Sequence, residues 1–318
     1  MPKRCRRDPP PPTDVLAVMP VPPWAAPGAR GAQLSRHHLD QLSTRVLTGS
    51  VGPPGAGGKA WRTKLADEVV NASAELTELR HRSAGDTRTL FLSSFFVDRL
   101  GGVGDEPYHF ERVRRWLTPR KLMARCGVES VFALERVLIP ANVAHAEGRH
   151  WLLAEVRPRH GSIRCFDSAD GGEMAEANLQ VLRALRRWLV DESARPAAAS
   201  TVAATELGTQ ASAQPLSPSK WGLARGDCPQ RRDYAGDCGV YMLTNARLLA
   251  AGEPLEYSEA DVPALRRRIA QALLRAGSHT TTTTTAAAAD DDNDDDADDD
   301  DDEDSGDGSG AGRSGSRR

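Results

Sequence analysis

The segment Gly236-Asp237-Cys238-Gly239-Val240-Tyr241-Met242 is the most informative stretch of this 318-residue chain. Apolar residues continue from it at helical spacing, so the sequence predicts a helix that begins at Cys238. At a helix N-terminus the backbone N–H groups and the macrodipole favour a thiolate over a thiol, which lowers the pKa of the cysteine. Cys238 is therefore the candidate nucleophile. A small, buried hydrophobic side chain is the alternative interpretation of this residue.

A candidate base and a group that orients it come from two short segments nearer the N-terminus. Residues 150–156 and 161–167 have the pattern of strands, and they flank the turn-like segment 157–160. A hairpin centred on that turn pairs His150 with Asp167 at its open end. Asp167 is then expected to accept a hydrogen bond from one ring nitrogen of His150 and to leave the other nitrogen facing a thiol. A purely structural pair at a strand end is the alternative.

These residues resemble the Ulp1/SENP family of cysteine proteases, which process SUMO and related ubiquitin-like proteins. The shared motifs, in the family's order and approximate spacing, are His150-Trp151, Phe166-Asp167-Ser168, Pro229-Gln230 and Gly236-Asp237-Cys238-Gly239. Further segments resemble the family's W-L-N-D-E, S-F-F, V-R-R-W and I-x-I-P-x-N motifs and its closing arginine-rich helix; they are residues 65–71, 93–96, 113–116, 137–142 and 262–269. The likeness runs from about Leu39 to about Gly277.

The resemblance implies an α+β fold of the papain-like clan, with a central mixed or antiparallel sheet, flanking helices and the nucleophile at a helix N-terminus. It implies that Cys238 attacks the carbonyl at the C-terminal Gly-Gly of a ubiquitin-like protein. His150 would take the thiol proton and return one to the leaving amine, and Asp167 would orient the imidazole. Water would then hydrolyse a thioester acyl-enzyme.

The chain departs from the family pattern at the oxyanion hole. The family's glutamine is the second Gln of a P-Q-Q string, six residues before the cysteine. Here Arg232 stands at that offset, whereas Arg231 takes the place of the second Gln if the match is anchored on Pro229. Gln230, eight residues before Cys238, is the predicted oxyanion donor, together with the backbone N–H of the cysteine.

A second departure concerns the tunnel that covers the substrate's di-glycine in the family. Trp151 corresponds to one tunnel residue and is therefore predicted to contact the substrate. The family's other tryptophan directly precedes the Leu-Asn-Asp of the early motif. Lys64 stands at that position in this chain and Trp61 lies three residues upstream, so Trp61 is not included in the predicted site.

Composition divides the chain into three parts. Residues 1–34 are predicted to be a disordered Pro-rich arm, residues 35–277 a protease domain with a low-complexity loop insertion at 193–219, and residues 278–318 a disordered Thr/Ala/Asp-rich acidic tail. Residues 290–318 hold 14 acidic and 3 basic side chains, which leaves 38 basic and 30 acidic in the rest, a net charge of +8 against −3 for the whole chain. The tail is therefore a candidate for electrostatic self-shielding, with simple solubilisation as the alternative.

Cysteine usage and the lack of long apolar runs bear on location and cofactors. The five cysteines are sparse, contain no C-x-x-C pair and fit a reducing compartment; they are Cys5, Cys126, Cys165, Cys228 and Cys238. We expect no metal, no cofactor and no membrane segment, and an intracellular protein of the nucleus or cytoplasm. The basic residues 3–7 are a candidate nuclear signal.

Three function classes stay open at this point. The first is a thiol protease or isopeptidase for SUMO, NEDD8 or another ubiquitin-like protein, acting as a monomer on precursors or conjugates. The second is a weakly active or inactive module that binds such a protein. The third is a relative that cuts something else, such as a viral or mobile-element polyprotein. The first is favoured because nucleophile, base and orienting group occur in order, and no nucleic-acid-binding motif accompanies the basic charge.

Overall fold

The computed structural model of the chain describes residues 15–25, 29, 31–42, 64–145, 148–169, 174–195, 217–232 and 236–284. The first fourteen residues, Trp61, most of the predicted insertion and the chain beyond residue 284 lie outside the described residues. The predictions of disorder made for those segments stay predictions.

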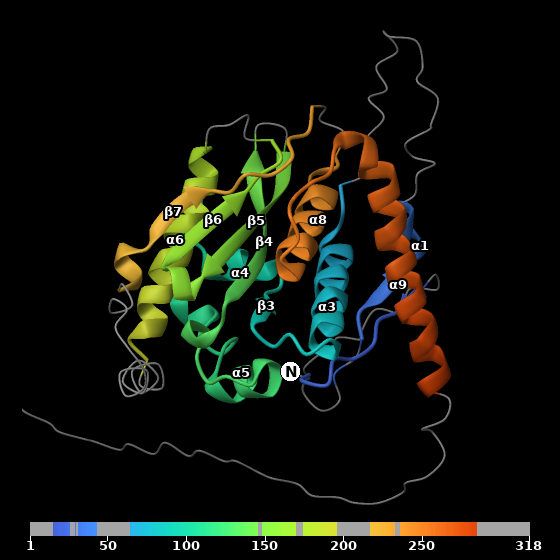
Figure 1. The fold of residues 1–318 in the computed structure, drawn as a ribbon, viewed down its shortest axis with the longest axis horizontal. Coiled ribbons are helices and arrows are strands. Elements are labelled where there is room, and N and C mark those ends of the chain that lie inside the picture. Colours follow the sequence, from blue (N-terminus) through green and yellow to red (C-terminus); the bar gives the residue numbers. More distant parts are fainter. Residues whose placement is uncertain are drawn as a thin grey trace, which may run out of the picture.

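A mixed five-stranded sheet forms the centre of the domain (Figure 1), in the order β3-β4-β5-β6-β7. The antiparallel core is made of β4 (Arg136–His145), β5 (Gly148–Arg157) and β6 (Ser162–Phe166). Parallel strands lie at both edges, β3 (Thr89–Phe91) beside β4 and β7 (Gly222–Arg225) beside β6. With helices on both faces, this arrangement confirms the predicted α+β class with a mixed sheet.

Helices cover both faces of the sheet because the strand side chains are apolar on both sides. Trp151 and Leu153 of β5 pack with α3 (Asp67–Ser83), α8 (Cys238–Ala251) and α9 (Val262–Thr284). Leu152, Ala154 and Val156 point the other way, toward a second cluster built with helices on the opposite face. The helices that contribute to that cluster are α4 (Phe95–Leu100), α5 (Pro119–Cys126) and α6 (Glu176–Ser193). The sheet lies between the two clusters and contributes residues to both, so it supports both layers.

Single-turn 3-10 helices connect several elements, at Phe110–Arg112, Val131–Ala133, Pro158–His160, Pro218–Lys220 and Glu259–Asp261. Helix α6 packs on the core through a stripe of apolar side chains at helical spacing. Its buried members include Leu182, Leu185, Trp188 and Leu189, while Leu179 is only half-buried.

Part of the predicted N-terminal arm is ordered. Strand β1 (Val15–Val18) pairs antiparallel with β2 (Gln33–Ser35), which leads into α1 (Arg36–Asp40). β1 packs directly on α9, where a Cβ added to Gly277 would come within 2.7 Å of the Ala17 Cβ. The prediction of a disordered arm over residues 1–34 missed this strand because its short apolar run lies between prolines. Helix α9 also continues past the predicted domain boundary at 277.

The hairpin that carries the candidate base differs in register from the prediction. Val156 pairs with Ile163, two positions beyond the predicted partner, because the four-residue turn, made of the 3-10 helix and the left-handed Gly161 (φ 55°), lies at residues 158–161, one position later than predicted. A shift of two residues keeps every side chain on its predicted face, whereas a shift of one would invert the strand. His150 therefore lies opposite Val143 of β4, and Asp167 follows the last residue of β6.

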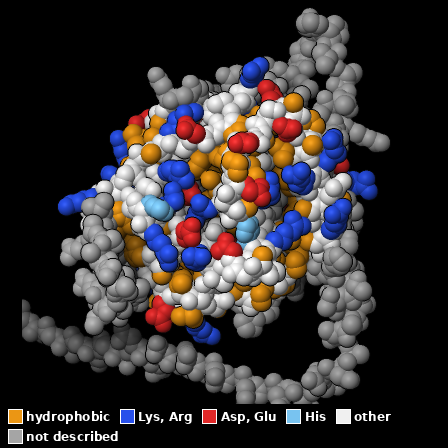
Figure 2. Space-filling model, viewed as in Figure 1, with side chains coloured by type: hydrophobic (Ala, Val, Ile, Leu, Met, Phe, Trp, Pro, Cys, Tyr) orange, Lys and Arg blue, Asp and Glu red, His pale blue; other side chains and the backbone are white. Residues whose placement is uncertain are grey.

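Basic side chains are spread over the face of the molecule shown in Figure 2, with apolar side chains between them. A groove between α3, α8 and α9 is part of this helical layer, with Leu76, Leu243 and Ile269 among its apolar lining residues. Its arginines are Arg80, Arg247 and Arg268. The acidic residues of the predicted tail lie outside the described residues, so the self-shielding hypothesis stays a prediction.

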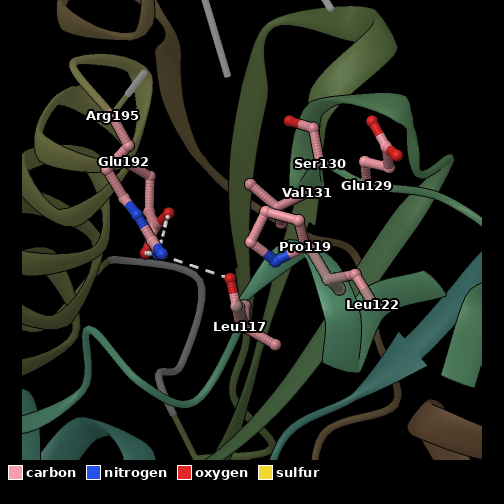
Figure 3. Close-up of a pocket in the computed structure, with 8 residues that line it drawn as sticks. All are labelled: Leu117, Pro119, Leu122, Glu129, Ser130, Val131, Glu192 and Arg195. Atoms are coloured by element: carbon pink, nitrogen blue, oxygen red, sulfur yellow. Dashed lines mark hydrogen bonds and ion pairs between the residues drawn. The ribbon is translucent and has the colours of Figure 1, made fainter. Parts of the chain in front are cut away.

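A second, smaller pocket lies between the end of α6 and the segment around α5 (Figure 3). Arg195 closes one side of it by pairing with Glu192 at 2.9 Å and donating to the carbonyl of Leu117 at 3.3 Å. These contacts of Arg195 tie the end of α6 to the segment before α5.

Of the adjacent residues Phe95 and Phe96, only the second belongs to the core. Phe96 is fully buried and makes edge-on contacts with Trp116 and Trp188, at centroid distances of 5.5 and 5.0 Å. Phe95 is 47% exposed, because neighbouring positions at the start of α4 point to different sides of the helix.

We expect Phe96→Ala to lower the free energy of unfolding by roughly 3–5 kcal/mol, because it empties an aromatic site in a packed core. Phe95→Ala is the matched control and should change it by less than about 0.5 kcal/mol. Urea unfolding followed by circular dichroism measures both values. Similar losses for the two variants would contradict this assignment of core and surface.

Candidate active site

Helix α8 begins at Cys238, as the sequence predicts. Its first turn is set by the Asp237 carbonyl, which accepts hydrogen bonds from the N–H groups of Val240 at 2.8 Å and Tyr241 at 3.1 Å. A Cβ added to Gly239 would lie 3.1 Å from the side chain of Leu65, so the glycine permits a close approach of the segment before α3. Cys238 itself is buried, with 1% of the residue exposed.

A buried ion pair fixes the residue just before the nucleophile. Arg266 of α9 is 1% exposed, and its Nε donates to Asp237 Oδ1 at 2.8 Å, with a second contact from Nη2. The same guanidinium donates through Nη1 to the carbonyl of Gln41 at 2.5 Å. The arginine-rich helix thus ties the start of α8 to the N-terminal segment. Removing one partner of a buried pair leaves an uncompensated charge, so this contact constrains the geometry strongly.

The predicted base and orienting group are in direct contact. His150 Nε2 lies 2.6 Å from Asp167 Oδ1, and the two residues are 2% and 3% exposed. The contact is diagonal across the strand ends, which lies within reach of long side chains. Asp167 accepts two further hydrogen bonds, from the Ala169 N–H at 2.8 Å and from Asn178 Nδ2 at 2.7 Å. These donors, together with His150, outweigh the effect of burial and lower the pKa of Asp167.

Asn178 is a site residue that the sequence analysis missed. It lies at the start of α6 and is 2% exposed, on the same face as Leu182 and Leu185. A polar side chain among the apolar positions of an amphipathic helix is the signal that pointed to it, because a buried amide requires a hydrogen-bond partner.

The other side of the imidazole interacts with the nucleophile through a hydrogen bond between His150 and Cys238. Because Nε2 of the ring is bound to Asp167, the nitrogen available to the sulfur is Nδ1. Burial opposes the protonated imidazole, but the hydrogen bonds and charges of Asp167 and Cys238 outweigh it and raise the pKa of His150 to about 9.

The pKa of Cys238 shifts in the opposite direction. Burial opposes the thiolate, yet the hydrogen bond and charge of His150, the backbone N–H of Trp151 and the charge of Arg231 together lower the pKa of Cys238. Opposite shifts in two neighbouring groups favour a thiolate and imidazolium pair near neutral pH. The site can therefore present a nucleophile and a proton donor before any substrate binds.

The side-chain amide of Gln230 makes hydrogen bonds to main-chain carbonyls, and its role as an oxyanion donor stays a prediction. Its amide Nε2 donates to the carbonyl of Asp167 at 2.8 Å and to that of Cys228 at 3.2 Å. The Cys228 carbonyl is close in sequence, whereas the Asp167 carbonyl lies just past the end of β6. The amide therefore fastens the segment before the nucleophile to the end of β6. The acceptor is supplied by the fold, which brings the carbonyl of the buried Asp167 next to Gln230.

Trp151 is largely enclosed in this structure. It is 2% exposed, and its indole N–H donates to the carbonyl of Leu65 at 2.8 Å. The contact holds the segment before α3 beside the start of α8, where Leu65 meets Gly239. Its predicted contact with the substrate stays a prediction.

Within the described residues, no group of three or more His, Cys, Asp or Glu side chains is arranged to hold a metal ion. Cys126, Cys165, Cys228 and Cys238 form no disulfide there. The same part of the chain holds no helix with the length and apolar character needed to cross a membrane.

Residues 63–278 match the family described as "Ulp1 protease family, C-terminal catalytic domain". The chain belongs to the Ulp1 protease family. The matched residues include every residue of the site described above except Gln41. Strands β1 and β2 also lie before the matched range.

The Ulp1 domain of this chain has curated relatives at 25–28% identity. It is 28% identical over 221 residues to the ubiquitin-like-specific protease ESD4 of Arabidopsis thaliana, covering 68% of this chain and 38% of that protein. It is 25% identical over 186 residues to the ubiquitin-like-specific protease 1 of Saccharomyces cerevisiae, covering 58% and 24%. The sentrin-specific protease 3 of Homo sapiens is 28% identical over 216 residues, covering 68% and 30%. The chain thus spans about a quarter to two fifths of the length of these three relatives.

Solved structures show the same Ulp1 fold. The C-terminal protease domain of Ulp1 in complex with Smt3, the yeast ortholog of SUMO, superposes with a TM-score of 0.53 at 20% identity, covering 77% of this chain and 85% of that one. The Ulp1-like SUMO protease catalytic domain of Chaetomium thermophilum gives a TM-score of 0.50 at 21% identity, covering 84% and 94%. These likenesses confirm the fold.

We expect the rate at which iodoacetamide alkylates Cys238 to rise with pH, with a midpoint below about 8.5, the pKa of an ordinary thiol. Since His150 stabilises the thiolate, His150→Ala should move this midpoint upward. Alkylation rates for the Cys238 peptide, measured by mass spectrometry between pH 5 and 10, test both statements. An unshifted midpoint in the wild-type protein would contradict the thiolate and imidazolium pair.

Asn178→Ala should lower the free energy of unfolding by roughly 1–3 kcal/mol, because it leaves a buried oxygen of Asp167 without its donor. Arg183→Ala on the same helix is the control, since Arg183 pairs with Glu176 on the exposed surface and should contribute less than about 1 kcal/mol. Urea titrations of the two variants provide the comparison. A loss no greater than that of the control would show that Asn178 is not needed to satisfy the carboxylate.

Proposed function

We propose that this protein is a thiol protease and isopeptidase that cleaves after the C-terminal Gly-Gly of SUMO or a related ubiquitin-like modifier. The observation that carries the proposal is the continuous set of buried contacts from Asp167 through His150 to Cys238, at the start of a helix in a Ulp1 domain. A core cysteine with no chemical task has no need of an imidazole whose pKa is raised to about 9 beside it.

Each group has a definite part in the proposed reaction. The Cys238 thiolate attacks the carbonyl carbon of the terminal glycine, a C–S bond forms, and the carbonyl electron pair moves to oxygen. When that pair returns, the C–N bond breaks and the imidazolium of His150 protonates the leaving amine. Water, deprotonated by His150, then attacks the thioester and releases the modifier's carboxylate and the Cys238 thiol. Asp167 keeps the ring oriented and stabilises its charged form throughout.

The substrate class rests on the relatives. Those reported above carry the names ubiquitin-like-specific or sentrin-specific protease, and one structural neighbour holds the yeast ortholog of SUMO. A large modifier also suits a nucleophile that is 1% exposed, because only a thin tail reaches such a thiol. SUMO is therefore the first candidate substrate and NEDD8 the second. The enzyme is proposed to act as a monomer.

One observation favours a second candidate function. The amide of Gln230 donates to two main-chain carbonyls, so the expected oxyanion donor is already engaged. Loss of one such donor reduces the rate by about 10²–10³. A weakly active or inactive module that binds a ubiquitin-like protein is the alternative.

Vinyl-sulfone probes built on SUMO, NEDD8 and ubiquitin test the proposal. We expect one probe, most readily SUMO, to form a covalent adduct that is lost in Cys238→Ala. Cys228→Ala is the matched control because this neighbouring thiol is half-buried and lies outside the proposed reaction, so its adduct should persist. Binding of a modifier without an adduct, measured by calorimetry, would select the binding module. If no probe formed an adduct or bound to the protein, both proposed functions would be contradicted.

A further inference from the structure

The segment before α8 is fastened to the end of β6 at two consecutive residues. The Gln230 amide donates to the Asp167 carbonyl, and the backbone N–H of Arg231 donates to the Ser168 carbonyl at 2.9 Å. Asp167 is the residue whose carboxylate holds His150. The backbone of Arg231 is thereby fixed next to the base, with little freedom to drift away from the site.

The two neighbouring arginines differ in their surroundings. Arg231 is half-buried, whereas Arg232 is exposed. The positive charge of Arg231 is also among the groups that stabilise the Cys238 thiolate, beside His150 and the Trp151 backbone N–H. The charge of the Arg231 guanidinium therefore acts at the reacting sulfur, from a half-buried residue whose backbone is anchored to Ser168. The guanidinium carries five N–H donors and a permanent charge.

The proposed reaction needs such a group. A negative charge develops on the carbonyl oxygen, one bond away from the carbon that the sulfur attacks. The N–H of Cys238 is one available donor, because the first N–H groups of a helix have no partner within the helix. A second donor is required, and the amide of Gln230 is committed to the main chain.

We propose that the Arg231 guanidinium is the second donor to this oxyanion and replaces the glutamine amide that the family uses. This inference rests on the proposed protease function. It also decides between the two possible alignments, since Arg232 stands at the family's offset from the cysteine but points to solvent, whereas Arg231 lies beside the base. Arginine retains its protons during the step, and the hydrogen bond to the oxyanion is charge-assisted, hence stronger than that from a neutral amide.

The test is steady-state turnover of a fluorogenic C-terminal amide of whichever modifier labels Cys238. We expect Arg231→Ala to lower kcat by about 10²–10³ with little change in KM, because the interaction exists only after attack. Arg231→Gln should recover part of that loss by restoring an amide donor. Arg232→Ala is the matched control and should stay within about threefold of the wild type.

A second measurement separates the oxyanion from the thiolate. Iodoacetamide alkylation passes through no oxyanion, so at a pH above each variant's alkylation midpoint, Arg231→Ala should react at the wild-type rate. An equal fall in alkylation and turnover would show that Arg231 acts only through the sulfur or the fold and would overturn the proposal. Unchanged kcat in Arg231→Ala, or a change in KM alone, would do the same. Absence of turnover in the wild-type protein would instead count against the proposed function itself.

Discussion

A charged carboxylate buried at the end of the central sheet sets the constraint on which the rest of the site depends. Asp167 is 3% exposed, and a buried carboxylate stays ionised only when donors surround it. It receives those donors from three directions, namely a strand of the sheet, its own loop and helix α6. The same carboxylate stabilises the imidazolium of His150, and that imidazolium stabilises the thiolate. Removing its donors would therefore weaken the fold and the chemistry together.

The charges at the start of α8 alternate in sign over a short distance. Arg266 neutralises Asp237 on one side of the helix start, and His150 neutralises Cys238 on the other. Neither pair is accessible to bulk water, so each is weakly screened and depends on accurate placement. Packing provides that placement: Gly239 allows Leu65 to approach, and Trp151 holds Leu65 through its carbonyl. The early segment of the domain thus supports the nucleophile without taking part in the reaction.

The chain keeps the Ulp1 fold at about 20% identity to solved relatives because the fold depends on the apolar pattern of its two layers. The polar segment before the nucleophile is under different constraints. There Gln230 has become a main-chain anchor, and an arginine fixed beside Asp167 carries a charge that acts on the sulfur. On our proposal, the fold has been retained while the means of stabilising negative charge has changed from an amide to a guanidinium.

Whereas the α+β class was implied by the resemblance to the Ulp1/SENP family, local patterns in the sequence were enough to predict the start of α8 at Cys238 and the two strands that carry His150 and Asp167. These features follow from periodicity and from short motifs, which act over a few residues. The pairing of His150 with Asp167 was also predicted, although the assumed register was wrong by two residues. It survived because a shift of two preserves the face of a strand.

Tertiary structure alone decided the remaining points. The turn conformation at Pro158–His160 set the register, and the packing of β1 on α9 ordered a segment that its composition assigned to an arm. Residues far away in sequence also decide three side-chain environments. They are the burial of Phe96 but not of Phe95, the donor role of Asn178, and the hydrogen bond from the Gln230 amide to the Asp167 carbonyl. A side chain's partner is set by which acceptor or cavity the folded chain brings within about 3 Å, and no local pattern encodes that distance.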